Sequence, residues 1–110
     1  MEKTFYLAAM TGNVQGVKDI LRNNPNLNVN WSNENDNGST ALITACDHGH
    51  DSIVCILLAH PDIDVNQKDD GGWTPFSCAC IHGHPSCARE MLKDSRVKVN
   101  EPKNDGITPL

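Results

Sequence analysis

The feature that most constrains the fold of this chain is an internal repeat with a period of 34 residues. Gly38, Gly72 and Gly106 are 34 residues apart, and residues 38–66 lie over residues 72–100 at that offset. Identical pairs in the two segments include Thr40/Thr74, Ala45/Ala79, Cys46/Cys80, His48/His82, Gly49/Gly83, His50/His84 and Asn66/Asn100. A unit of this length cannot bury its apolar face alone, so consecutive units must stack on one another. The sequence therefore predicts a solenoid.

The repeat divides the chain into units of unequal regularity. A divergent first copy matches the second at Ala8, Gly12, Leu21 and Asn30. We expect an N-terminal capping unit over residues 1–37, full units over 38–71 and 72–105, and the start of a fourth unit over 106–110. The first unit ends in an asparagine-rich stretch, NNPNLNVNWSNENDN, which is expected to form a mobile loop.

Each full unit is predicted to form two short helices followed by an extended loop. In the third unit, Thr74 can cap the free amides of a helix, and Pro75 suits the first helical position. Gly49 and Gly83 stand where a first helix of about nine residues would end, because glycine adopts the left-handed conformation common at such ends. After the second helix, the stretch DVNQKDDGGW supplies the aspartates and glycines of a hairpin-like loop.

These units resemble those of the ankyrin repeat family. Thr74–Ala79 reads T-P-F-S-C-A and Thr40–Ala45 reads T-A-L-I-T-A, against the family signature T-P-L-H-x-A. The Gly-His pair after the first helix and the Val-Asn pair at the close of each unit also follow the family. The chain departs from the signature at Ile43 and Ser77, which replace its histidine, so the hydrogen bonds of that histidine are expected to be missing.

The resemblance implies an all-α repeat solenoid of stacked helix-turn-helix units joined by hairpin loops. It also implies a function, that of a non-catalytic module that binds a protein partner through the concave face formed by the first helices and the hairpins. A second interpretation keeps the fold and makes the chain a regulatory or targeting fragment of a larger multidomain protein, whose activity lies beyond residue 110. The fold alone does not choose between these two functions.

The segment SCACIHGHPSCAR places three cysteines and two histidines close together, and zinc prefers such side chains. The repeat offers a simpler explanation, since Cys80, His82 and His84 have identical counterparts in the preceding unit. In a helix Cys78 and Cys80 point to nearly opposite sides, so they cannot share an ion. We therefore predict buried thiols and turn histidines, with no metal and no other cofactor. The less favoured alternatives are a zinc site and a nucleophile pair of Cys78 and His82.

Composition and charge argue against several classes of partner. The formal net charge is -5 and no cluster of Lys and Arg occurs, so neither nucleic acid nor an anionic membrane surface is expected to bind. The longest apolar run, Ile53–Ala59, is far shorter than the roughly 20 residues of a membrane span. Five cysteines without a secretory signal predict reduced thiols in an intracellular, cytoplasmic protein. The sequence contains no glycine-rich loop of the kind that binds phosphate, so it gives no indication of an enzyme or of a small-molecule substrate.

Residues that vary between units at exposed positions are the candidate contacts for a protein partner. Trp73 follows a repeat-opening glycine and Ile81 ends a first helix, so both are expected to face solvent, unless Trp73 folds back on its own hairpin. Apolar residues grouped on one face indicate a binding surface, and tryptophan is enriched among the residues that dominate interfaces. The complete predicted set adds Met10 and a polar rim, giving Met10, Asp47, His48, Asp70, Trp73, Ile81 and His82.

Asn66 is a candidate modification site through the resemblance. Leu58 and the segment Asp64–Asn66 resemble the target of an oxygen-dependent asparaginyl hydroxylase that acts on ankyrin proteins. A plainer role is also open, in which Asn66 bonds its own backbone in a turn.

The edge of the last full unit is a candidate surface for self-association. No polar capping unit follows it in this sequence, and terminal units of solenoids need a polar outer face. We expect this edge to expose part of four residues, Ala79, Cys80, Ala88 and Leu92.

Overall fold

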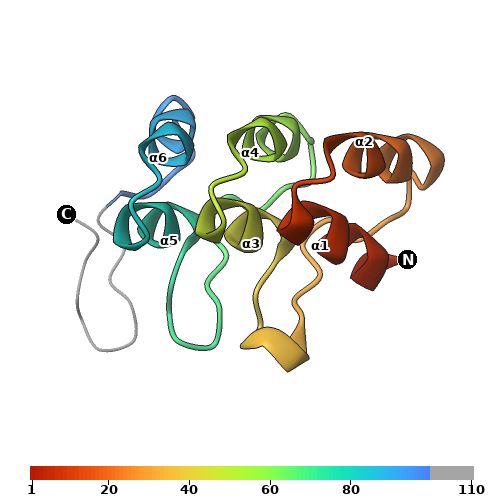
Figure 1. Ribbon diagram of the computed structural model, residues 1–110, viewed down its shortest axis with the longest axis horizontal. Helices are drawn as coiled ribbons and strands as arrows, with labels where there is room; N and C mark the ends of the chain where they lie inside the picture. The colour runs from red at the N-terminus through yellow and green to blue at the C-terminus, as the bar shows by residue number, and fades with distance from the viewer. Residues whose placement is uncertain (100–110) are drawn as a thin grey trace.

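The computed structural model describes residues 1–99 and builds that part of the chain from six α-helices without a β-strand. They are α1 (Glu2–Thr11), α2 (Val14–Asn23), α3 (Ala41–Asp47), α4 (Asp51–Leu58), α5 (Pro75–Ile81) and α6 (Pro85–Leu92), with a short 3-10 helix, η1 (Glu34–Asp36), before α3. Figure 1 shows α1, α3 and α5 in one layer, α2, α4 and α6 in a second, and long loops projecting from the first layer away from the second. The predicted all-α repeat solenoid is confirmed. The expected fourth unit, over residues 106–110, lies outside the described residues.

The helix starts follow from the chemistry of the sequence. Thr74 caps α5, because its hydroxyl accepts a hydrogen bond from the N–H of Ser77 while the Ser77 hydroxyl accepts one from the N–H of Thr74. Thr40 caps α3 through the N–H of Ile43. The expectation that the bonds of the signature histidine are missing concerned Ile43 and Ser77; at Ser77 a hydroxyl makes hydrogen bonds of its own, whereas the side chain of Ile43 has no polar atom. A small hydroxyl replaces the imidazole as half of a capping box.

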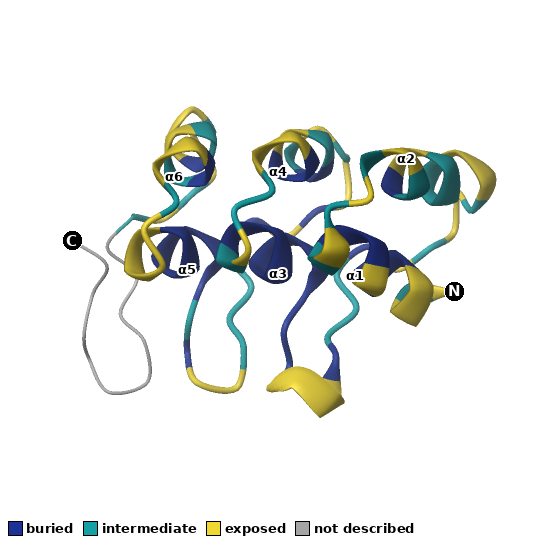
Figure 2. Cartoon of the chain, in the orientation of Figure 1, coloured by how far each residue is buried: buried dark blue, intermediate teal, exposed yellow. Residues whose placement is uncertain are grey.

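The buried core runs along the first layer of helices. Figure 2 shows α3 buried over its length, and Ala41–Cys46 are all buried. Equivalent positions of the three units carry large apolar side chains that are at most 2% exposed: Phe5, Leu42 and Phe76. α3 packs against both α1 and α5, whereas α2, α4 and α6 each cover one side of their own first helix. Each unit is thus completed by its neighbours.

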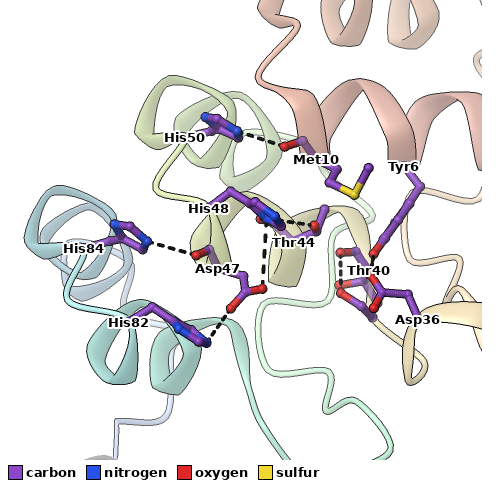
Figure 3. Close-up of polar contacts among 11 residues, drawn as sticks. Tyr6, Met10, Asp36, Thr40, Thr44, Asp47, His48, His50, His82 and His84 are labelled. Atoms are coloured by element: carbon purple, nitrogen blue, oxygen red, sulfur yellow. Dashed lines mark hydrogen bonds and ion pairs between the residues drawn. The ribbon is translucent and has the colours of Figure 1, made fainter.

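A histidine in the turn before α4 and another before α6 bond the unit that precedes them. His84 Nε2 donates a hydrogen bond to the backbone carbonyl oxygen of Asp47, the last residue of α3, at 2.9 Å. The imidazole lies against Gly49, whose φ of 76° is the left-handed conformation predicted there. The helix that precedes Gly49, α3, ends at Asp47 with His48 as its C-cap. It is therefore two residues shorter than the nine expected. The same arrangement joins the first two units, through His50, Met10 and Gly12 (Figure 3).

A second set of bonds between units runs through the asparagines that close them. Asn66 Nδ2 donates to the carbonyl oxygen of Arg96, and Asn66 Oδ1 accepts from the N–H of Lys98, both at 2.8 Å. The expectation that Asn66 bonds only its own turn is therefore wrong, because both polar atoms of its side chain reach the next unit. The equivalent pair one unit earlier joins Asn30 to the backbone of Asp62 and Asp64.

The asparagine-rich junction is a folded turn rather than the open loop expected. Asn33 and Ser39 form an antiparallel bridge that encloses η1, and Asn33 is buried. The junction is also bonded to α1, because the hydroxyl of Tyr6 donates to the carboxylate of Asp36, and the ring of Trp31 meets Tyr6 edge-on. Composition alone suggested mobility here, but the asparagine side chains serve as local caps and acceptors.

The loop between α4 and α5 forms the predicted hairpin. The N–H of Asp69 donates to the carbonyl oxygen of Trp73 at 3.0 Å, and the N–H of Gly72 donates to the carbonyl oxygen of Asp69 at 3.0 Å. The hairpin is fastened to the preceding junction, since the N–H of Asp70 donates to the carbonyl oxygen of Asn37 at 2.8 Å. This bond therefore joins the two neighbouring loops, which lie beside the first helices.

Gly49→Ala and Gly83→Ala form a matched pair that isolates the packing of His84. Both glycines have positive φ, 76° and 69°, so alanine costs about 1–2 kcal/mol of backbone strain at either position. A Cβ at Gly49 would also stand 2.7 Å from the ring of His84, whereas none of the described residues lies within 4 Å of one at Gly83. We expect Gly49→Ala to lower the free energy of unfolding further, by about 1 kcal/mol or more. Urea denaturation followed by circular dichroism measures this, and equal losses would show that His84 adds no stability to the stack.

Candidate functional site

An open groove of about 340 Å³ lies between the loops and the helices of the first layer. Its walls come from three places: the junction before α3, the hairpin before α5, and side chains of α3 and α5. We call it the inner groove, and it is lined by Asp36, Asn37, Ser39, Ile43, Asp47, Asp69, Trp73, Cys78, Ile81 and His82.

Trp73 forms the hairpin wall of the inner groove. The backbone N–H of Trp73 donates to Asp69 Oδ1 at 2.9 Å, and the same oxygen accepts from the backbone N–H of Gly71 at 2.9 Å. One carboxylate therefore holds the hairpin closed. The indole lies against Gly71, where a Cβ would stand 3.1 Å from Trp73 Cδ1, and it packs in part on the core. Trp73 is therefore half-buried: it folds back on its hairpin and also lines the groove.

The ends of α3 and α5 form the opposite wall. His82 Nε2 lies 2.6 Å from the carboxylate of Asp47, and this contact joins the end of α5 to the end of α3 (Figure 3). His48 Nδ1 is 4.0 Å from the other carboxylate oxygen and 2.9 Å from the carbonyl oxygen of Thr44. Beside them Ile81 is 61% exposed.

Four of the seven predicted contact residues meet in the inner groove: Asp47, Trp73, Ile81 and His82. His48 touches the group through Asp47. Met10 lies in the last turn of α1 one unit away, where its carbonyl oxygen accepts from His50, and Asp70 lies at the hairpin tip with its carboxylate against Gly38. These two residues do not line the groove.

Sequence analysis missed the part of the groove that comes from the preceding unit. Asp36, Asn37 and Ser39 lie in the junction that was expected to be loose, and Asp69 was regarded only as a turn residue. The repeat carried a signal for the first of these, because Asp36 is one period before Asp70 in the hairpin. Adjacent loops of a solenoid line the same groove, so a hairpin residue in one unit points to its equivalent in the next.

The cysteines of the third unit follow the repeat. Cys78 is 5% exposed and its thiol lines the base of the groove, while Cys80 on the other side of α5 is exposed. Burial, together with the nearby charges of Asp47 and Asp69, raises the pKa of Cys78 to about 12, so it is a neutral thiol at neutral pH. A neutral thiol is a poor nucleophile, which weighs against the pair of Cys78 and His82.

The other buried thiols behave alike, and no cluster of metal ligands forms near them. Burial raises the pKa of Cys87 to about 11 and that of Cys46 well above the usual thiol value. Within residues 1–99, no three side chains of His, Cys, Asp and Glu are placed together so that they could hold a metal ion.

At the C-terminal edge of the third unit, the exposure of one of the four named residues differs from the prediction. Cys80 and Leu92 are exposed, the latter by 56%, and Ala88 is half-buried. Ala79, however, is fully buried, because its methyl group belongs to the core shared with the preceding helices. The apolar part of this edge therefore rests mainly on Leu92.

Comparison with known families identifies the repeat. The sequence profile described as ankyrin repeats (3 copies) matches residues 2–69, and that of the single ankyrin repeat matches residues 71–104. The chain belongs to the ankyrin repeat family. Ankyrin repeats are in general non-catalytic modules of protein–protein interaction. The resemblance in the sequence is thus confirmed.

A curated relative in this family is osteoclast-stimulating factor 1 from Xenopus laevis. It is 35% identical over 68 residues, which make up 62% of this chain and 30% of that protein. The matched segment thus spans less than a third of the relative.

In the described part of this chain, no helix has the length and apolar content that a bilayer crossing requires.

Thiol labelling tests the burial of the cysteines. Thiol reagents attack the thiolate, so accessible groups of low pKa react first. At neutral pH we expect the folded protein to label at Cys55 and Cys80 alone, and all five cysteines to label after denaturation. Serine at both exposed positions should leave the folded protein without rapid labelling. Rapid reaction of Cys46, Cys78 or Cys87 in the folded state would contradict the buried positions described above.

Proposed function

We propose that this chain binds a protein partner in the inner groove, on the concave side of the ankyrin stack, without catalysing a reaction. The observation that carries the proposal is the meeting of Trp73 and Ile81 in one open groove, although they come from a hairpin and from the end of a helix. Met10, Asp47, His48, Asp70 and His82 are proposed as further contacts around them.

The energetics of apolar burial support this role for the groove. The side chain of Ile81 is 61% exposed, so a partner that covers it gains the free energy of removing that surface from water, about 25 cal/mol per Å². The backbone of Trp73 is bonded within its hairpin and its indole packs in part on the core, so little conformational entropy is lost on binding. Tryptophan is one of the residues enriched at interface hot spots, where surrounding contacts exclude water.

A second candidate function places the same module in a larger protein, as a regulatory or targeting segment. The relative from Xenopus laevis supports it, because the matched segment is only 30% of that protein. We further propose that the protein acts in the cytoplasm. Its five cysteines are all free thiols, which fits a reducing compartment.

Paired variants test the groove against the edge of the stack. Trp73→Ala/Ile81→Ser removes the apolar contacts of the groove, and Leu92→Ser removes a comparably exposed side chain, 56% against 61%, at the open edge. We expect a partner captured by the wild-type chain to be kept by Leu92→Ser and lost by the double variant. With the purified partner, the double variant should weaken Kd by roughly 30-fold, the equivalent of about 2 kcal/mol.

The opposite pattern would place binding elsewhere. Loss of the partner by Leu92→Ser alone would assign binding to the edge of the last unit, and concentration-dependent sedimentation of the wild-type chain alone would assign that edge to a second copy. Circular dichroism of both variants before capture separates lost contacts from lost folding.

We also propose Asn66 as a hydroxylation site, with Leu58 as the upstream recognition residue. Asn66 is half-buried and both polar atoms of its side chain bond the next unit, so access to it requires that the units part. Peptide mass spectrometry of the protein purified from its own cells should find one added oxygen at Asn66. An unmodified peptide under oxygen-replete growth would end the proposal.

A further inference from the structure

We propose that the inner groove selects a basic segment of the partner, an extended peptide that presents an arginine or lysine side chain next to an aliphatic one. This inference rests on the proposed function, since it names the chemistry of the partner that the same groove binds. It begins from the charges that line the groove and from what neutralises them.

Carboxylates dominate the polar lining of the inner groove. Asp36, Asp47 and Asp69 face it from the junction, from the end of α3 and from the hairpin, and within residues 1–99 no Lys or Arg lines it. The whole chain has a formal net charge of -5. A concave site with one sign of charge focuses its field on the opening, so cationic groups are concentrated there and anionic ones are repelled.

The internal partners of these carboxylates orient them and leave most of their charge in place. Asp36 accepts from the hydroxyl of Tyr6, and Asp69 accepts from two backbone N–H groups. Burial and the bond to Asp36 raise the pKa of Tyr6, so that hydroxyl stays neutral. In the described part of the lining the one basic side chain is that of His82, which is bonded to Asp47. The groove therefore holds fixed acceptors in excess of cations.

The apolar lining explains why the charge alone is not sufficient for binding. Trp73 lies in the same wall as Asp69, and a cation over an indole ring is attracted by the ring as well as by a nearby carboxylate. Arginine suits this pair best, since its planar guanidinium stacks on an aromatic ring and donates to carboxylates at once. Ile43 and Ile81 line the remaining surface, where an aliphatic neighbour in the peptide is buried.

The volume and charge of the groove disfavour other occupants. About 340 Å³ admits a few side chains of an extended segment and not a folded domain. A second copy of this chain would bring another formal charge of -5 to an acidic groove. An acidic peptide would face the same repulsion.

A peptide library tests the proposal directly, because it offers the groove acidic, basic and uncharged segments at the same time. The probe is a random dodecapeptide library displayed on phage, selected on the wild-type chain and counter-selected on Trp73→Ala/Ile81→Ser. We expect the peptides that depend on the groove to be enriched in an arginine or lysine beside an aliphatic residue. Enrichment of acidic or uncharged peptides would overturn this inference and leave the proposed function standing. If no selected peptide depends on Trp73 and Ile81, both fail.

A charge-matched pair of variants then tests whether the carboxylate of Asp69 interacts with the cationic side chain of the peptide. Asp69→Asn keeps the oxygen that accepts from the hairpin N–H groups but removes the charge, and Asp62→Asn makes the same change at an exposed residue outside the groove. For a selected basic peptide, fluorescence anisotropy should show Kd weakened about fivefold by Asp69→Asn and unchanged by Asp62→Asn. The salt dependence of Kd should also become shallower in Asp69→Asn.

Two results of this pair would overturn the inference. Equal weakening by both variants would mean that the peptide responds to the overall charge of the chain. An unchanged Kd in Asp69→Asn, with unchanged salt dependence, would mean that the groove does not read the cation. In either case, loss of the same peptide by Trp73→Ala/Ile81→Ser would still support binding in the groove.

Discussion

The structure depends on contacts between units that cannot bury their apolar faces alone. The bond from the His84 imidazole to the carbonyl oxygen of Asp47 is the clearest of these, because it satisfies a free carbonyl at the end of α3 and places a ring against Gly49. Glycine is required there, since any Cβ would meet the ring and the backbone is left-handed. Asn66 makes the corresponding connection on the loop side of the stack.

The candidate groove is a consequence of this stacking. Asp47 takes part in both, because its backbone oxygen accepts from His84 while its carboxylate holds His82 and lines the groove. The hairpin wall is held by backbone bonds, so Trp73 and Asp69 stand at a fixed distance from the helix ends. The contact between units and the lining of the groove therefore use different atoms of Asp47.

The segment rich in cysteine and histidine shows how a repeat changes the meaning of a motif. Taken alone, these side chains indicate a metal site or a nucleophile. In the stack His84 is a bond between units, His82 binds Asp47, and Cys78 is a buried thiol whose pKa is raised to about 12. Each side chain is explained by its position in the unit, and chemistry at this segment is not required to account for it.

The sequence by itself determined the period, because identical residues recur at a fixed spacing along the chain. It also determined the helix starts at Thr40 and Thr74 and the left-handed turns at the glycines, because each of these depends on a few consecutive residues. It predicted Trp73 and Ile81 as candidate contact residues, and both line the inner groove. Only the tertiary structure decided that Asp36 and Asp69 line the same groove and that Asn66 reaches the next unit. Those contacts join residues about one repeat apart, and which atoms meet across that separation depends on how the units pack rather than on any local pattern.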